Sequence, residues 1–306
     1  MKLPLYDAAA IARALPPGEA VAALEAALRG GLDPEADPPR SSVAAAGGEL
    51  LVMPSAAAGG LGVKLASVAP GNAARGLPRI QGVYVLFDAG TLAPAALLDG
   101  IELTNLRTSA VSALAVLHLA ATPPRRLVVF GTGPQAAAHV AALRAVAPIE
   151  DVRVVGRDAA RTAAFAREHG AAPGGPDAVA GADVVCCCTT AREPLFDGDA
   201  VPGAATVVAI GSHEPGAREV DERLAARATV VVESRAAALR EAGDVIAAVE
   251  AGALDPGDLV GLAELVRGER APGPGPRLFK STGMAWEDLV VARAVHGATG
   301  APPGAA

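Results

Sequence analysis

Residues 126–146 read RLVVFGTGPQAAAHVAALRAV and pass from an apolar run to a glycine turn and then to an alanine-rich segment. The apolar run at 127–130 is typical of a strand buried inside a parallel sheet. The segment 134–146 has the composition of a helix and opens with a proline, which favours the first helical turn. Strand, glycine turn and helix in this order predict the first half of a βαβ unit.

The glycine turn matches the pattern G-x-G-x-x-A, with Gly131, Gly133 and Ala136 at the fixed positions. Gly131 allows a tight turn, Gly133 lets the backbone approach a pyrophosphate, and Ala136 lets the helix pack close to the strand. The helix begins at Pro134 and Gln135, where free N–H groups and the positive end of the dipole favour phosphate. The pattern predicts a dinucleotide-binding turn, and a purely structural glycine turn is the alternative.

The second strand of this unit, at 152–155, ends without the acidic residue that usually binds the ribose hydroxyls of NAD. Gly156 stands at the strand tip and is followed by Arg157, with Arg161 one helical turn later. Two guanidinium groups at this place suit a 2′-phosphate, so the sequence favours NADP over NAD. The alternative is that Arg157 is only a solvated charge and that Asp158 caps the next helix.

The remainder of the chain divides into two patterns. After residue 152, apolar strands that alternate in part with helical stretches predict an α/β fold, with a Rossmann-type parallel sheet covered on both faces. Before residue 100, a meander of strands predicts a smaller α+β domain, followed by a helix that Thr104 caps. The expected strands of the meander are 41–46, 49–53, 62–69 and, last of the set, 82–87, and the later strands are 183–188, 206–210, 229–232 and 277–280.

Composition and charge exclude several functional classes. Of 306 residues, 33 are acidic and 26 are Lys or Arg, which gives a net charge of −7, and only 3% are aromatic. A chain with this balance and no basic run is a poor candidate for binding nucleic acid or an anionic membrane. It shows no apolar run long enough to span a bilayer, no signal-peptide pattern and no zinc-ligand spacing around its three adjacent cysteines. We expect a cytoplasmic protein without a metal site.

Short motifs spread over nearly the whole chain resemble those of the ornithine cyclodeaminase/mu-crystallin family. They are LGVKL at 61–65, PGN at 70–72, QG at 81–82, LRTSA at 106–110, the glycine turn, AREP at 191–194, REVD at 218–221 and STGMA at 281–285. The resemblance implies a domain at 1–115 that binds a small amino-acid or imino-acid substrate, forms a homodimer and is completed by a C-terminal helix at 285–306. Residues 116–284 would form the Rossmann domain.

Lys64 and Arg107 carry charges at positions where the sequence predicts an unfavourable environment. Lys64 lies inside an apolar strand, and Arg107 is expected near the start of a helix, where a cation opposes the dipole. A bound anion between them would remove both costs, and structural ion pairing is the alternative. The resemblance assigns Lys64, Arg107 and Arg40 to the carboxylate of an amino acid and gives Lys64 a catalytic role as well. For Arg40 a solvated loop charge is the alternative.

His213 stands where cyclodeaminases and related alanine dehydrogenases of the family carry an aspartate, after the strand that ends near Ile210. Histidine is a competent acid or base near neutral pH, but it is not an anion that would attract a substrate ammonium. We therefore expect His213 to be the catalytic acid/base and ornithine cyclodeamination to be disfavoured.

Together these residues predict an enzyme that moves hydride between NAD(P) and the α-carbon of an amino acid or imino acid, with reduction of a cyclic imine favoured. Two alternatives stay open: an ornithine cyclodeaminase, and a non-catalytic crystallin-type protein that binds NADP and a small carboxylate. The expected cofactor contacts come from Arg107, Thr108, Gly131, Gly133, Pro134, Gln135, Arg157, Thr189, Ile210, Gly211, Thr282 and Gly283.

Overall fold

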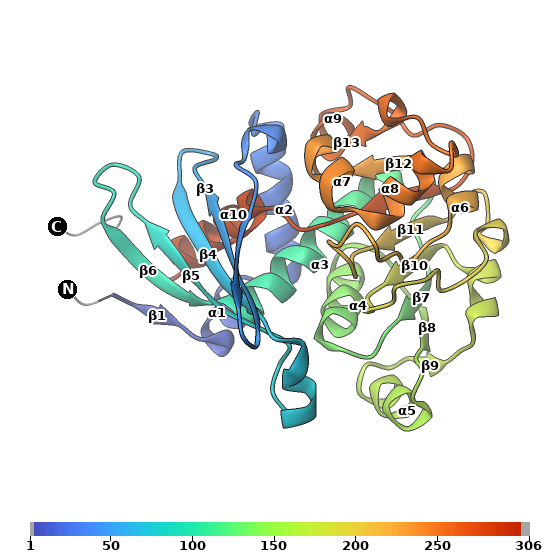
Figure 1. The fold of residues 1–306 in the computed structure, drawn as a ribbon, viewed down its shortest axis with the longest axis horizontal. Helices are drawn as coiled ribbons and strands as arrows, with labels where there is room; N and C mark the ends of the chain where they lie inside the picture. Colours follow the sequence, from blue (N-terminus) through green and yellow to red (C-terminus); the bar gives the residue numbers. More distant parts are fainter. Residues whose placement is uncertain (1–2, 301–306) are drawn as a thin grey trace. The chain divides into compact units, whose positions relative to one another are not determined.

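The computed structural model describes residues 3–300, which form an α/β protein of two compact units (Figure 1). Unit 1 contains the chain up to Arg107 and again from Met284, and unit 2 runs from Thr108 to Gly283. The α/β class expected from the sequence is confirmed. No helix in the described residues is long and apolar enough to cross a membrane.

A six-stranded sheet forms the centre of unit 1, in the order β1-β6-β5-β4-β3-β2. Neighbours from β2 to β6 are antiparallel, as the meander predicted, and only β1 and β6 pair in parallel. The strands are β1 (Leu5–Tyr6), β2 (Ser41–Ala45), β3 (Gly48–Ser55), β4 (Leu61–Val68), β5 (Ile80–Phe87) and β6 (Pro94–Asp99). The prediction that the meander ends at residue 87 was wrong. The segment PAALLD of β6 lacks the β-branched and aromatic residues by which strands are recognised.

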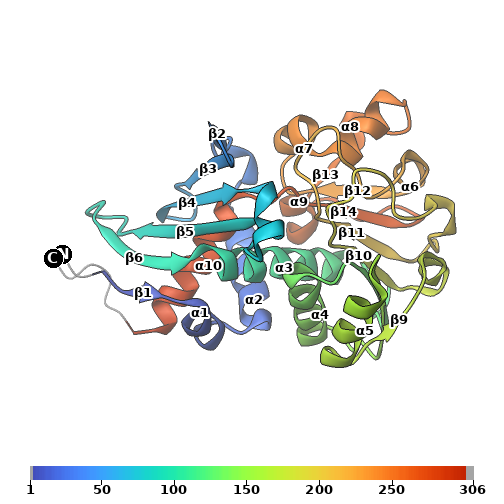
Figure 2. The same cartoon turned by 60° about the horizontal axis from the view of Figure 1, so that its bottom comes forward.

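The helices of unit 1 are α1 (Ala8–Ala14), α2 (Pro17–Arg29), α10 (Ala285–Ala298) and the first part of α3 (Gly100–Leu119). Helix α10 packs against α2 and across β3, β4 and β5; Figure 2 shows it in red behind the strands, beside the blue α2. Helix α3 begins at Gly100 because the Asp99 carboxylate accepts hydrogen bonds from the next backbone N–H groups. The expected cap at Thr104 was wrong, since its hydroxyl donates to the Gly100 carbonyl inside the helix.

Unit 2 contains an all-parallel sheet of eight strands in the order β13-β12-β14-β11-β10-β7-β8-β9. The strand order reverses at β7 and β10, and in such sheets ligands bind beyond the carboxyl ends of the strands at this point. The strands are β7 (Arg126–Phe130), β8 (Asp151–Val155), β9 (Ala172–Pro173), β10 (Val184–Cys187), β11 (Thr206–Ala209), β12 (Thr229–Val232), β13 (Val260–Gly261) and β14 (Arg277–Lys280).

Alternate side chains of this sheet enter different parts of the core of unit 2. Phe130 and Cys187 join one cluster with Leu224 and Val245 from the helices that cover that face. Cys186, the neighbour of Cys187, is also fully buried, and all three cysteines are free thiols whose pKa is raised by burial. The helices of unit 2 are the second part of α3, α4 (Pro134–Val146), α5 (Ala159–Glu168), α6 (Glu222–Arg227), α7 (Arg235–Glu241), α8 (Gly243–Glu250) and α9 (Leu262–Arg267). Short 3-10 turns lie at Pro34–Ala36, Pro70–Arg75, Pro176–Gly181, Gly198–Ala200 and Pro256–Asp258.

Candidate active site

The glycine turn between β7 and α4 has the backbone that a pyrophosphate site needs. Gly131 has φ 110°, and a Cβ there would lie 2.4 Å from the Cys188 carbonyl oxygen, so the position requires glycine. Gly133 caps α4 without a side chain, and a Cβ on it would meet no atom within 4 Å. Ala136 is fully buried against the strand. The N–H groups of α4 are therefore open to a ligand, and the residues present fit a dinucleotide.

The tip of β8 holds no acidic side chain. A Cβ on Gly156 would lie 2.4 Å from the Thr162 hydroxyl oxygen, so the strand tip has little room for a longer side chain. Arg157 and Arg161 are both exposed. Asp158 caps α5 by accepting from the backbone N–H of Arg161 at 2.9 Å, as the alternative interpretation held for that aspartate.

A buried carboxylate that the sequence analysis missed joins the loops after β10 and β11. The Glu219 carboxylate accepts from the backbone N–H of Thr189 (2.8 Å), from the Thr189 hydroxyl (2.7 Å) and from the backbone N–H of Gly211 (2.7 Å). Burial raises the pKa of Glu219 to about 7, and the nearby Lys280 charge opposes that shift. Two expected cofactor residues, Thr189 and Gly211, are thus held by one side chain.

A second buried network fixes the backbone next to His213. The Lys280 ammonium, at the end of β14, is 2.9 Å from the Asp244 carboxylate and donates to the Ser212 carbonyl at 2.9 Å. The other oxygen of Asp244 accepts from the backbone N–H groups of Glu219 and Val220. His213 itself is half-buried in the loop after β11. The network therefore anchors the loop that carries the expected acid/base.

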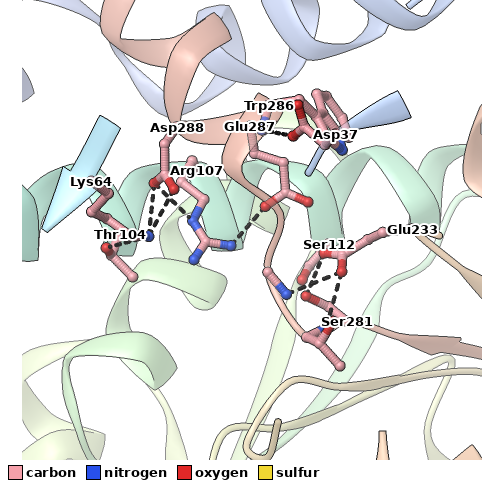
Figure 3. A network of polar contacts seen from close by, with 12 residues as sticks. Asp37, Lys64, Thr104, Arg107, Ser112, Glu233, Ser281, Trp286, Glu287 and Asp288 are labelled. Atoms are coloured by element: carbon pink, nitrogen blue, oxygen red, sulfur yellow. Dashed lines mark hydrogen bonds and ion pairs between the residues drawn. The ribbon is translucent and has the colours of Figure 1, made fainter. Parts of the chain in front are cut away.

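Thr282 and Gly283, the expected cofactor residues near the end of unit 2, also have a buried hydrogen-bond acceptor. Glu233 accepts from the Ser281 hydroxyl at 2.6 Å and from the backbone N–H groups of Thr282 (2.9 Å) and Gly283 (3.0 Å) (Figure 3). These backbone groups are accordingly engaged within the protein. Among the residues that the structure describes, no group of three or more His, Cys, Asp or Glu side chains is placed to hold a metal ion.

In unit 1, Lys64 and Arg107 lie side by side with two acids of helix α10 (Figure 3). Lys64 alternates with the half-buried residues of β4 and so points to the face that α10 covers, where it is only 2% exposed. Its ammonium is 2.8 Å from Asp288 and donates to the Thr104 hydroxyl at 3.4 Å. The Arg107 guanidinium donates to Glu287 at 2.7 Å and lies 3.2 Å from Asp288.

This geometry corrects one reason for singling out Arg107. Helix α3 begins at Gly100, so Arg107 lies beyond its first turn, where the dipole has little effect. The ion pairs that the alternative interpretation named are present, with Glu287 and Asp288 as the acids. Burial and the Arg107 charge lower the pKa of Lys64 to about 8, while Asp288 raises it. The signal in the sequence was two adjacent acids inside a mostly apolar helix.

Arg40 belongs to the same electrostatic environment. Its charge contributes to lowering the pKa of Lys64, so the two cations are neighbours, and Arg40 is half-buried rather than fully solvated. Three residues earlier, the Asp37 carboxylate accepts from the Ser55 hydroxyl at 2.7 Å and from the backbone N–H of Trp286 at 2.6 Å. Burial raises the pKa of Asp37. Asp37 therefore joins the segment before Arg40 to the start of α10.

The motifs and the fold agree with a comparison with known proteins. The characteristic sequence pattern of the ornithine cyclodeaminase/mu-crystallin family matches residues 9–301. The chain belongs to this family. A curated family member, the Δ1-pyrroline-2-carboxylate reductase 2 of Burkholderia ambifaria, is 40% identical over 266 residues, which cover 84% of this chain and 83% of that protein.

Solved structures of the family have the same fold. The Δ1-pyrroline-2-carboxylate reductase of Thermococcus litoralis, in complex with NADH and L-proline, has a TM-score of 0.89 and 27% identity, with 97% of each chain covered. An archaeal alanine dehydrogenase dimer with bound NAD has a TM-score of 0.89 and 26% identity, with 98% of this chain and 96% of that chain covered. Both solved structures therefore combine this fold with a bound nicotinamide dinucleotide.

The open space at Gly133 gives a test of the dinucleotide site. We expect Gly133→Val to abolish binding of NADH and NADPH, because a branched side chain occupies the approach to the helix N-terminus. The fold should survive, since no atom lies within 4 Å of the new Cβ and φ is −95°. Fluorescence titration measures binding, and Gly203→Val, at another open glycine, is the control. Wild-type affinity in Gly133→Val with its fold intact would place the site elsewhere.

Proposed function

We propose that this family member is an NAD(P)H-dependent reductase of cyclic imino acids, with Δ1-pyrroline-2-carboxylate as the substrate and proline as the product. The observation that carries the proposal is the grouping of three cations in unit 1, Arg40, Lys64 and Arg107, which suits a small carboxylate although Asp288 and Glu287 already pair with Lys64 and Arg107. The similarity to Δ1-pyrroline-2-carboxylate reductases supports the choice of substrate.

The residues of the proposed site bind, orient and protonate the substrate. Arg40, Lys64 and Arg107 bind the substrate carboxylate and so orient the α-carbon and the imine nitrogen, and such positioning can contribute several kcal/mol to the rate. When bound, the reduced nicotinamide supplies the hydride that the α-carbon accepts. His213 gives its proton to the imine nitrogen, which completes the conversion of C=N to CH–NH. Lys64, as an ammonium beside the substrate, stabilises the carboxylate throughout.

The dinucleotide would be held by unit 2. The pyrophosphate is assigned to Gly131, Gly133, Pro134 and Gln135, where α4 begins. Arg157 is assigned to the adenosine end of the cofactor. The other proposed contacts come from Arg107, Thr108, Thr189, Ile210, Gly211, Thr282 and Gly283. The Glu219 carboxylate supports this proposal, because it holds Thr189 and Gly211 in one defined arrangement.

The activity is tested by following NAD(P)H oxidation with Δ1-pyrroline-2-carboxylate beside ammonia release from ornithine. We expect imine reduction to dominate, because a histidine at 213 can protonate an imine but gives no attraction to a substrate ammonium. His213→Ala should lower the reductive kcat by roughly 10²–10⁴-fold, the usual effect of losing a general acid. His169→Ala is the control. Rapid ammonia release from ornithine without imine reduction would overturn the proposal.

For the cofactor we propose a preference for NADPH. Arg157 and Arg161 are exposed beyond a strand tip that carries glycine instead of an acid. Arg157→Ala should weaken NADPH binding by roughly tenfold or more and leave NADH binding nearly unchanged, since only NADPH carries the 2′-phosphate. Arg167→Ala, at the other end of α5, is the matched control. Equal losses for both cofactors would remove Arg157 from this role.

We also propose a homodimer formed through unit 1. The face of the sheet opposite Lys64 is apolar and half-buried, with cross-strand pairs Leu61–Phe87, Val63–Val85 and Leu65–Val83. A relative of this family is a dimer. Val63→Lys should give a folded monomer because a charge is costly in such an interface, whereas Leu239→Lys, on an exposed residue of unit 2, should not. Sedimentation velocity decides, and a monomeric wild type would contradict the proposal.

A further inference from the structure

Lysine is rare in this chain and both described lysines are buried. The sequence holds 26 Lys or Arg residues, of which only Lys2, Lys64 and Lys280 are lysines. Lys64 is 2% exposed and Lys280 is 1% exposed, and each is paired with a buried aspartate; Lys2 lies outside the described residues. An ammonium is a compact point charge, whereas a guanidinium is broad and planar.

The partner of Lys64 is shared with a second cation. One oxygen of Asp288 is 2.8 Å from the Lys64 ammonium nitrogen, and the other is 3.0 Å from that nitrogen and 3.2 Å from Nε of Arg107. Asp288 is fully buried on α10, whereas Lys64 lies on β4 and Arg107 on α3. One carboxylate therefore bridges two like charges that would otherwise repel each other in an apolar interior.

Its neighbour on α10 has a narrower role. Glu287 is also fully buried, and it forms an ion pair with Arg107 at 2.7 Å. Asp288 contacts the Lys64 ammonium directly and raises its pKa, whereas the direct ion pair of Glu287 is with Arg107. The two adjacent acids therefore differ in the cations that they contact directly, and an experiment can separate their effects on the Lys64 ammonium.

We propose that Asp288 is a positioning residue of the reductase: it holds Lys64 and Arg107 together in their cationic forms, ready to bind the carboxylate of the substrate. The proposal rests on the function proposed above, because that function assigns the carboxylate to these cations. Asp288 is not placed in contact with substrate or cofactor. It acts through Lys64 and Arg107, from a helix that follows the whole of unit 2 in the sequence.

The surroundings of Lys64 determine the direction of the expected effect. Burial lowers the pKa of Lys64 first, the Arg107 charge lowers it further, Arg40 adds to this, and Asp288 raises it, to give about 8. The other ionisable groups around these residues are Tyr84, the cross-strand neighbour of Lys64, whose pKa burial raises, and the acids Asp37 and Glu287. Removing the Asp288 charge must therefore lower the pKa of Lys64 below 8.

The test compares Asp288→Asn with Glu287→Gln, two isosteric changes that each remove one buried negative charge of α10. Labelling the lysine side chains with ¹³C at Cε gives only three resonances, because the chain has three lysines. Lys64→Arg assigns the Lys64 signal by its disappearance. The pH titration of that signal then reports the charge of Lys64 directly, without any need for turnover.

We expect the Lys64 signal of the wild type to titrate near pH 8, that of Asp288→Asn to titrate at least about one pH unit lower, and that of Glu287→Gln, which does not lose the direct contact with the ammonium, to move less. In the assay, Asp288→Asn should raise KM for the imino acid roughly tenfold or more with a smaller change in kcat. A purely structural role would not move the titration of Lys64.

The outcomes separate the two proposals. A wild type that reduces no cyclic imine defeats the proposed function, yet the lysine titration still decides whether Asp288 maintains the charge of Lys64. Titration and KM of Asp288→Asn equal to those of the wild type overturn the positioning role. If circular dichroism shows that Asp288→Asn does not fold, Asp288→Glu replaces it: the charge is kept but displaced, so KM should rise while Lys64 still titrates near 8. An unchanged KM in Asp288→Glu overturns the proposal.

Discussion

The arrangement of unit 1 depends on one buried ion pair, between the Lys64 ammonium and the Asp288 carboxylate, whose nitrogen and oxygen are 2.8 Å apart. Breaking a buried pair by removing one partner costs about 3–5 kcal/mol, because a charge is left alone in an apolar interior. The two residues are 224 positions apart, so the pair ties the C-terminal helix to an interior strand of the first sheet. Helix α10 thereby becomes part of the site around Lys64, although all of unit 2 lies between strand β4 and helix α10 in the sequence.

In unit 2, buried carboxylates also stabilise polar groups, here the backbone N–H groups at the carboxyl ends of the strands. Beyond the last ladder bond, backbone N–H groups need other acceptors if they are buried. Glu219, Asp244 and Glu233 provide them, each accepting from two backbone N–H groups of the adjoining loops. Buried carboxylates are costly to desolvate, which raises the pKa of Glu219 to about 7, but they define the loops that carry the expected cofactor contacts.

Most regular elements could be predicted because their signals are local. The limits of α4, α5, β12 and β14 follow from apolar runs, glycine turns and caps within a few residues. Strand β6 could not be predicted, because its alanines and leucines suit a helix as well and only pairing with β1 and β5 makes it a strand. The start of α3 was misplaced for a similar reason, since Asp99 and Thr104 are both acceptable caps until the chain folds.

The sequence by itself indicated the glycine turn and the unfavourably placed charge of Lys64, because Gly131, Gly133 and Lys64 are unusual in their own immediate surroundings. It could also say that such cations need a negative partner. Only the tertiary structure decided that the partners are Glu287 and Asp288 of the last helix. The reason is physical: an amino acid's local pattern reports its own cost of burial, whereas the group that offsets this cost is chosen by packing between segments far apart in the chain.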